Sequence, residues 1–314
     1  MKKPVNFQRI LCPTDLSRES EEGLRYAVVI AHSYGAKLFV CHSNEVMKTA
    51  VAPTDQMIRE AVEEQVARTL TPFVDAVGTF GLDWEPVVTS GGRPAEAIVR
   101  EAAGRKVDLI VMSSRRRPRA AVLLGSTAEA VSRHAPCPVL VTHPPEGRRR
   151  AVAPLLVAPR RVLIAYDFSV DSELALGYGL SLAQEYKSEV HLLHVLSDAG
   201  TDREEVSWDS PDAESPYHVA ARMLHQKVPA EVHLWCRVTH AVREGRPHQE
   251  ILAYAAEREV DLISIGAHGA GSRLGSLFGS TVDRVLREAR CPVLVARPVN
   301  YNPASLHGQE RKGG

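Results

Sequence analysis

The feature that most constrains the fold of this 314-residue chain is that its motifs occur twice, in the same order. The segment Arg9-Ile-Leu-Cys-Pro-Thr-Asp15-Leu-Ser17 returns as Arg161-Val-Leu-Ile-Ala-Tyr-Asp167-Phe-Ser169. Three further pairs are Gly92-Arg93-Pro94 with Gly245-Arg246-Pro247, Val107-Asp-Leu-Ile-Val111 with Val260-Asp-Leu-Ile-Ser264, and Cys137-Pro-Val-Leu-Val141 with Cys291-Pro-Val-Leu-Val295. A spacing of about 150 residues is far longer than a solenoid unit, so the repeat predicts two domains of one fold.

In each copy, short apolar runs alternate with amphipathic segments. The first copy predicts strands near residues 8–13, 37–42, 84–89, 107–112 and 138–142, and helices near 18–34, 54–79, 94–104 and 126–134. The second predicts strands near 161–166, 189–195, 232–239, 260–265 and 292–296, and helices near 170–187, 216–227, 247–258 and 280–289. This alternation is typical of α/β proteins with a doubly wound parallel sheet covered on both faces. Ligands of such sheets bind beyond the carboxyl ends of the strands, where Asp15 and Asp167 are expected.

The predicted organisation is a first domain over residues 1–143, a linker over 144–159, a second domain over 160–299 and a disordered tail over 300–314. The linker carries four prolines and a basic triplet ending at Arg150, which favours an extended segment over a helix or strand. The tail is assigned as disordered because it is polar and terminal.

The overall charge favours neither nucleic acid nor an anionic membrane as partner, because 38 basic side chains balance 38 acidic ones. The sequence contains no apolar run of about 18 residues and no signal-peptide pattern, so it predicts a cytoplasmic protein without a membrane span. The five cysteines are odd in number and form no Cys-x-x-Cys pair, which predicts buried, reduced thiols.

The segment GAHGAGSRLGSLFGST, Gly266 to Thr281, is the strongest candidate for a binding site. It lies between an apolar run and an amphipathic segment, and its glycines follow the spacing G-x2-G-x9-G-[ST]. Glycine lets the backbone approach a ligand, and a helix N-terminus offers unpaired N–H groups and partial positive charge. A strand, a glycine loop and a helix start in that order are typical of phosphate sites. A flexible surface connection remains the alternative. The spacing matches neither a Walker A motif nor a dinucleotide fingerprint.

Aligned in this way, the chain resembles the universal stress protein (UspA) family from Phe7 to Pro298. Three features carry the resemblance: the Asp-x-Ser after the first strand, the Gly-Arg-Pro before the third helix, and the glycine loop followed by Cys-Pro-Val-Leu-Val. The resemblance implies two tandem flavodoxin-like domains, each with strand order 3-2-1-4-5. It also implies membership of the branch that binds ATP.

The resemblance further implies a nucleotide site in the second copy. Asp167 would contact the nucleoside, Ala165 would line the adenine side, and the backbone of Val195 would hydrogen-bond the adenine. Ile265 would pack on the base. Ribose and phosphates would be held by Gly266, Gly269, Gly279, Ser280 and Thr281. The implied ligand is ATP with Mg²⁺ or Mn²⁺, and the ion would be held mostly by phosphates and water.

The first copy departs from this pattern. Alignment of Gly125-Ser126-Thr127 on Gly279-Ser280-Thr281 puts Met112 and Arg115 where the second copy has Gly266 and Gly269. A side chain at a left-handed backbone angle costs about 1–2 kcal/mol, and Met112 would put atoms where the ligand should lie. The sequence therefore predicts a first copy that binds ATP poorly or not at all, with Asp15 capping the first helix or fixing its loop.

Other candidates are weaker. The arginines of the Arg115–Arg119 loop could clamp a phosphate or an acidic partner, or form a solvated loop, and no aromatic residues interleave with them to stack bases. His268 could contact a phosphate or point to water. His191 and His194 are three apart on a predicted strand, so they face opposite sides and cannot share a metal.

The sequence therefore predicts a stress protein that binds ATP in its second domain and acts as a nucleotide-dependent switch or scaffold. No nucleophile–base–orienter set is visible, so fast catalysis is not expected. Two alternatives stay open: a slow ATPase or nucleotide-transfer enzyme using Asp167 and a divalent ion, and a nucleotide-free interaction module. The last strands, Val293-Leu-Val-Ala296 and Val139-Leu-Val141, are candidates for intramolecular or homodimer pairing.

Overall fold

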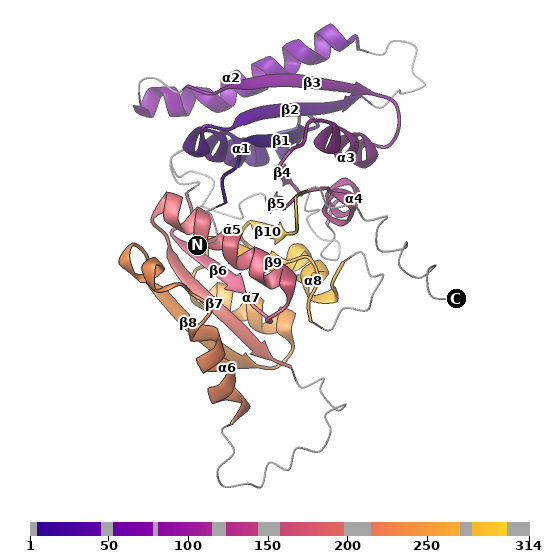
Figure 1. Cartoon of the computed structure of the whole chain (residues 1–314). Helices are drawn as coiled ribbons and strands as arrows, with labels where there is room; N and C mark the ends of the chain where they lie inside the picture. Colours follow the sequence, from indigo (N-terminus) through magenta and orange to yellow (C-terminus); the bar gives the residue numbers. More distant parts are fainter. Residues whose placement is uncertain are drawn as a thin grey trace, which may run out of the picture.

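The computed structural model of the chain has two halves of the same architecture, joined through the middle of one sheet (Figure 1). It describes residues 5–44, 53–77, 81–114, 124–143, 158–197, 215–270 and 278–299. We call 5–143 the first half and 158–299 the second half. The predicted tail, nearly all of the predicted linker and the Arg115–Arg119 loop lie outside the described residues, and the predicted domain boundaries stay a prediction.

Nine elements form the first half: β1 (Arg9–Thr14), α1 (Ser20–Tyr34), β2 (Lys37–Asn44), α2 (Asp55–Val77), β3 (Trp84–Ser90), α3 (Pro94–Gly104), β4 (Leu109–Ser113), α4 (Ser126–His134) and β5 (Val139–Thr142), among the described residues. The second half contains β6 (Arg161–Ala165), α5 (Val170–Tyr186), β7 (Glu189–Leu196), α6 (Pro216–His225), the 3₁₀ helix η3 (Ala230–Leu234), β8 (Val238–Glu244), α7 (Pro247–Glu257), β9 (Leu262–Gly266), α8 (Ser280–Glu288) and β10 (Val293–Ala296).

The strand order is β3-β2-β1-β4-β5-β10-β9-β6-β7-β8 in one ten-stranded sheet. Within each half the order is 3-2-1-4-5, and all pairs there are parallel. The predicted fold class is therefore confirmed. In both halves the order reverses beside the first strand, and that is where ligands of such sheets bind.

The two halves meet through an antiparallel pair, β5 and β10, in which Leu140 faces Leu294 and the flanking valines pair symmetrically. The last strands therefore pair with each other within the chain, as one of the two predicted alternatives had it. Since β4 and β9 occupy the other edges of β5 and β10, neither last strand offers a free edge for the predicted homodimer.

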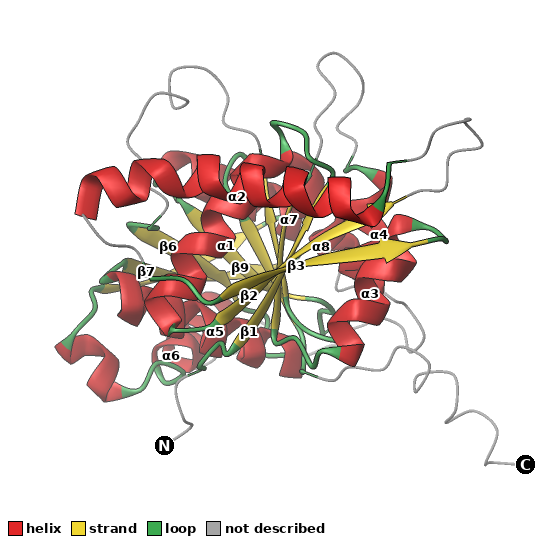
Figure 2. Ribbon diagram, turned by 90° about the horizontal axis from the view of Figure 1, so that it is seen from above, coloured by secondary structure: helices red, strands yellow, loops and turns green. Residues whose placement is uncertain are grey.

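Helices cover both faces of this sheet (Figure 2). One core cluster joins side chains of α1, α2, α5 and α6 to one face, and a second joins those of α3, α4, α7 and α8 to the other. Each cluster contains residues of both halves, so the cores continue across the β5–β10 seam. The five cysteines are all buried and free, as predicted.

The repeated Gly-Arg-Pro motif starts a helix in each half. Pro94 and Pro247 take the first helical position of α3 and α7, where the missing N–H costs no hydrogen bond. The preceding glycines, Gly92 and Gly245, have φ of 84° and 141°, in the region that disfavours side chains. The motif is thus a strand-to-helix turn that places the helix start at the carboxyl edge of the sheet.

One predicted strand is wrong. Residues 232–239 were expected to be extended, but η3 ends at Leu234 and the edge strand β8 spans Val238–Glu244. Pro229 stands at the N-cap of η3, and the apolar side chain of Val232 is buried there as part of the helical turn. The apolar spacing of this segment thus serves a short helix and not a strand. No helix of the described residues is long and apolar enough to cross a membrane.

Candidate functional site

The candidate site begins at the turn after β6. The carboxylate oxygen Oδ1 of Asp167 accepts hydrogen bonds from the backbone N of Ser169 at 3.1 Å and from its Oγ at 2.5 Å. Phe168, between them, has a left-handed φ of 66°. Ser169 also caps α5, since its Oγ accepts from the backbone N of Ser172 at 3.2 Å. Asp167 is therefore held in a fixed turn at the carboxyl end of β6.

The first half has the same turn. The backbone N of Ser17 donates to Oδ1 of Asp15 at 3.0 Å, and Leu16 has φ of 62°. The predicted role of Asp15 in fixing its loop is therefore confirmed, while no side chain caps α1 at its N-cap, Glu19.

The start of the glycine loop lies against Asp167. The backbone N of Ala270 donates to Oδ2 of Asp167 at 2.8 Å. A Cβ atom on Gly269 would lie 2.7 Å from that same oxygen. Gly269 thus lets the loop approach the carboxylate, and Asp167 joins the end of β6 to the loop that follows β9.

Gly266 is required for packing within the protein. A Cβ atom there would lie 2.7 Å from the carbonyl carbon and 2.9 Å from the carbonyl oxygen of Asp171, in the first turn of α5. Among the described residues, positive φ occurs at other glycines and not at Gly266, Gly269 or Gly279. The left-handed backbone assumed for Gly266 and Gly269 in the sequence alignment is therefore wrong. Close approach of the end of β9 to α5 is what excludes a side chain at 266.

His268 is tied to the same helix turn. Oδ2 of Asp171 accepts from the backbone N of His268 at 3.0 Å, and the ring Nδ1 lies 2.7 Å from that oxygen. Two residues of the loop start, His268 and Ala270, are thus held by the two carboxylates flanking Ser169. Sequence reasoning missed Asp171, because an acidic residue in a first helical turn usually serves only the helix dipole.

At the other end of the loop, Gly279 is the N-cap of α8 and donates its N–H to the carbonyl of Ala267 at 3.0 Å. Ser280 is exposed and Thr281 half-buried, both in the first turn. A helix start leaves the N–H groups of its first residues without intrahelical partners. The end of β9 and the start of α8 therefore meet, beside amides that have no partner within the helix.

The ladder of β7 determines where the backbone of Val195 points. The carbonyl of Leu193 accepts from Tyr166 N at 2.8 Å on the β6 side, and the carbonyl of Leu196 accepts from Gly245 N at 2.9 Å on the β8 side. Backbone groups of alternate residues face opposite neighbours, so Val195 faces the same way as Leu193. Because β6 ends opposite Leu193, the Val195 amide and carbonyl face the space beyond the end of β6.

The apolar candidates share one face of the sheet. Ala165 and Ile265 are paired residues of β6 and β9, exposed by 7% and 5%, and Val195 packs against the same core cluster. The structure thus brings all nine candidate residues to one edge of the second half: three apolar positions, Asp167, and the five loop and helix-start residues.

The histidines at the ends of β2 and β7 have a structural role. His194 Nδ1 lies 2.8 Å from the carbonyl oxygen of Tyr166, and His42 Nδ1 lies 3.0 Å from that of Thr14. Each imidazole thus contacts the backbone carbonyl at the carboxyl end of the first strand of its half: that of Thr14, the last residue of β1, and that of Tyr166, directly after β6. The recurrence of His at equivalent positions was the signal in the sequence.

The strand register corrects the alignment of the two loops. β4 ends at Ser113, which pairs with Thr142 at the end of β5. β9 ends at Gly266, which pairs with Ala296 at the end of β10. Ser113 therefore takes the place of Gly266, and Met112 that of Ile265; the predicted equivalence of Met112 and Gly266 is wrong by one residue. Arg115 lies outside the described residues.

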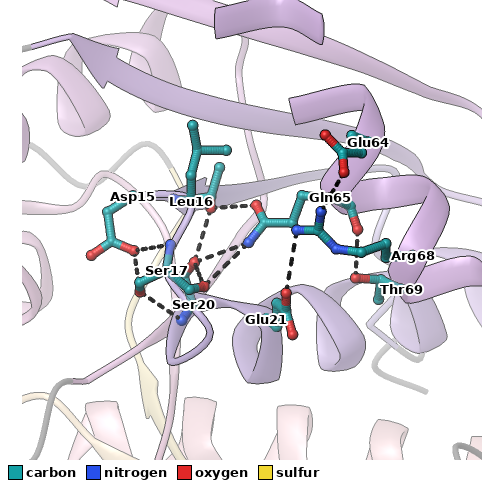
Figure 3. A network of polar contacts seen from close by, with 10 residues as sticks. Asp15, Leu16, Ser17, Ser20, Glu21, Glu64, Gln65, Arg68 and Thr69 are labelled. Atoms are coloured by element: carbon teal, nitrogen blue, oxygen red, sulfur yellow. Dashed lines mark hydrogen bonds and ion pairs between the residues drawn. The ribbon is translucent and has the colours of Figure 1, made fainter. Parts of the chain in front are cut away.

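In the first half, a buried polar network covers the region beside Asp15 (Figure 3). Gln65 of α2, with no exposed surface, bonds through its Oε1 to Thr14 Oγ1 at 2.6 Å. Its Nε2 donates to Ser20 Oγ and to the carbonyl of Ser17, both at 3.3 Å. This network lies on the side of the sheet that α1 and α2 cover, whereas Ala165 and Ile265 of the second half belong to the core cluster of the other side. In the second half, the equivalent of Thr14 is Tyr166, whose hydroxyl donates to Glu173 instead.

Among the ranges that the structure describes, no three His, Cys, Asp or Glu side chains are placed to hold a metal ion. The acidic groups of the candidate site are each engaged with backbone N–H groups, as described for Asp167 and Asp171.

Comparison with known proteins gives one consistent family. A sequence model of the universal stress protein family matches residues 6–143 and again 159–297. A universal stress protein of Mycolicibacterium smegmatis is 26% identical over 301 residues, 92% of this chain and 97% of its own length. One of Thermus aquaticus is 34% identical over 136 residues, 43% of this chain and 98% of its own. A crystal structure of a universal stress protein from Archaeoglobus fulgidus aligns with TM-score 0.64 and 25% identity, covering 92% of this chain and 98% of that one.

Proposed function

We propose, given that the chain belongs to the universal stress protein family as two such domains in tandem, that its second half binds ATP and acts as a nucleotide-dependent stress-response switch. The observation that carries this proposal is the convergence at one sheet edge of Asp167, the outward-facing backbone of Val195 and the start of α8. These groups fit a nucleotide in kind: a backbone donor and acceptor for a base, a carboxylate for a ribose, and helix-start amides for phosphates.

Asp167 supplies the switch. Its Oδ2 accepts the N–H of Ala270, and the same oxygen is the one that faces Gly269. A ribose hydroxyl that donates a hydrogen bond to Oδ2 would share this oxygen with the Ala270 amide. Nucleotide binding and the position of the loop start are then linked, and so is the surface that the loop presents to partners.

The first half is proposed to bind ATP weakly or not at all. The loop after β4 has no glycine before Gly125, and Ser113 stands where the second half has Gly266. Support for this asymmetry thus comes from the residues of the loop. The left-handed backbone angle assumed in the sequence analysis does not support it.

A thermal-shift titration with ATP and Mg²⁺ tests the proposal, on the wild type and on Ser280→Asp. An aspartate in the first turn favours the helix itself, so the unliganded variant should be at least as stable as the wild type. Its charge would repel phosphates at the same place. At a hundredfold excess over Kd, wild type should gain about 2.7 kcal/mol, or a rise in Tm of the order of 5 °C, and Ser280→Asp should lose that rise.

Ser126→Asp is the matched control, because Ser126 is the exposed first residue of α4 at the equivalent position of the first half. It should keep the full ATP-dependent rise. Gly266→Met is unsuitable, because its side chain would collide with the α5 backbone whether or not ATP binds. If wild-type protein carries no nucleotide and shows no rise, ATP binding is refuted, and a nucleotide-free interaction module becomes the better account.

A further inference from the structure

Two helices of different halves, α4 and α8, are joined by a symmetric set of four charges. Arg133 Nη2 lies 3.1 Å from Asp283 Oδ1, and Arg287 Nη2 lies 3.1 Å from Glu129 Oε2. Each arginine also pairs with the acid one turn earlier in its own helix. The four residues occupy equivalent positions in the two halves, so each helix contributes one acidic residue and one arginine to the contact, with Glu129 in α4 and Asp283 in α8.

The contacts that these four side chains make with other residues differ between the two halves. The Arg133 guanidinium lies over the ring of Phe278, 5.4 Å from its centroid, and that ring is only 6% exposed. Phe278 directly precedes Gly279, the N-cap of α8, and Asp283 lies in the first turn of that helix. A side chain of the first half thus contacts the start of α8 from both sides of its N-cap.

The backbone that carries Arg133 is itself fixed from the second half. Arg297, only 1% exposed, donates through Nη1 to the carbonyl oxygens of Ala135 at 3.0 Å and Arg133 at 3.3 Å, and through Nη2 to that of Ser132. A cation at the last carbonyls of a helix stabilises that end. The end of α4 is therefore anchored just beyond β10, which fixes the backbone that carries Arg133.

We infer that Arg133 is a positioning residue for the phosphate end of the proposed ATP site, so that the half with the degenerate loop supports binding in the other half. This inference rests on the proposed function. Asp283 places a negative charge one turn from the helix-start amides that would hold phosphates. Arg287 of the same helix pairs with this carboxylate, and Arg133 adds a second positive charge beside it from the other half. Through Phe278, the same guanidinium holds the N-cap in place.

Isothermal titration with ATP and with adenosine tests the inference on wild type, Arg133→Gln and Glu129→Gln. Arg133→Gln should weaken ATP binding about threefold to tenfold, the size expected for one charge at a partly exposed helix start, and leave adenosine binding within about twofold. Glu129→Gln breaks the mirror-image pair at the same seam but leaves Asp283 with Arg133. It should leave ATP binding within about twofold.

A second variant separates charge from stability. Arg133→Gln combined with Asp283→Asn removes both the cation that comes from the first half and the carboxylate that it pairs with, and should recover most of the lost ATP affinity. Equal losses in Arg133→Gln and Glu129→Gln, or equal losses of ATP and adenosine, would refute positioning in favour of general weakening of the seam. Unchanged ATP affinity in Arg133→Gln, beside a wild type that binds, would refute the inference alone. A wild type that binds no ATP would refute the proposed function and this inference together.

Discussion

Replacing Gly266 by alanine should destabilise the protein even in the absence of any ligand. The new Cβ would lie 2.7 Å from the carbonyl carbon of Asp171, and backbone cannot move aside as a flexible side chain can. We expect the free energy of unfolding to fall by about 1–3 kcal/mol, the usual cost of overpacking. Urea unfolding followed by circular dichroism measures it.

Gly177→Ala is the control for that substitution. Gly177 lies within α5, and a Cβ atom there would meet nothing within 4 Å. Because alanine is the better helix former, this variant should be more stable than wild type by about 0.5–1 kcal/mol. A Gly266→Ala protein as stable as wild type would mean that β9 and α5 are not held at this distance.

Gly266 and Gly269 show which roles of a single residue cannot be predicted from the sequence. The spacing G-x2-G-x9-G-[ST] locates the loop and the α8 start, and the repeated Asp-x-Ser indicates Asp167. The reason for each glycine was not accessible, because the partner of Gly266 is the backbone of Asp171, nearly 100 residues away, and the partner of Gly269 is a carboxylate across the sheet edge. A glycine that lets a ligand approach and a glycine that lets another part of the protein approach look the same in a sequence.

At the scale of elements, three imidazoles join α6, η3 and β8. The ring centroids of His225 and His240 are 4.8 Å apart, and His233 lies 6.3 Å from each. Burial lowers the pKa of His240, and the nearby His225 and His233 lower it further. The folded protein therefore binds a proton at His240 less readily than the unfolded chain does.

The pH dependence follows from that sign. The unfolded chain takes up the proton near its ordinary pKa of about 6.5, so the contribution of neutral His240 to stability is complete above that pH and is lost as pH falls below it. We expect the free energy of unfolding to decrease from about pH 7.5 to about pH 5.5, and to decrease less in His240→Phe, which keeps a ring in the cluster without a titrating group.

Burial also lowers the pKa of His191 and His248, so some of the decrease should persist in His240→Phe. Urea unfolding curves at the two pH values measure the difference between the variant and wild type. Equal decreases in both proteins would show that His240 does not contribute to the pH dependence.

The same elements show why the order of the fold was easier to predict than one of its boundaries. Continuous apolar runs identify buried parallel strands such as β6 and β9, and the repeat supplies each of them twice. β8 is an edge strand with half-buried side chains, so its apolar pattern is weak, and the neighbouring η3 carries the stronger one. The Gly-Arg-Pro motif that follows β3 and β8 alike is the better guide to where this strand ends.

At the scale of the whole molecule, the β5–β10 pair predicts what an isolated second half would do. Residues 158–299 alone would expose the β10 edge that Val139–Thr142 now covers. Because the register is symmetric about Leu140 and Leu294, a second copy of β10 can take the place of β5. Light scattering after size exclusion should show a dimer that dissociates on dilution, while the full chain lacks this equilibrium. A half that stays monomeric at all concentrations would contradict the pairing.

The buried Arg297 shows what a covalent link between two such domains allows. Arg297 and His143 occupy equivalent positions after β10 and β5, yet Arg297 reaches across to the end of α4 while His143 Nδ1 lies 2.7 Å from Ser114 Oγ in its own half. In an assembly of two identical chains, every amino-acid replacement is made twice, and neither copy can specialise. Within one polypeptide each position mutates singly. The tandem chain can therefore keep an arginine on one side of its pseudo-twofold axis and a histidine on the other. A homodimer of identical chains cannot have this difference between its two sides.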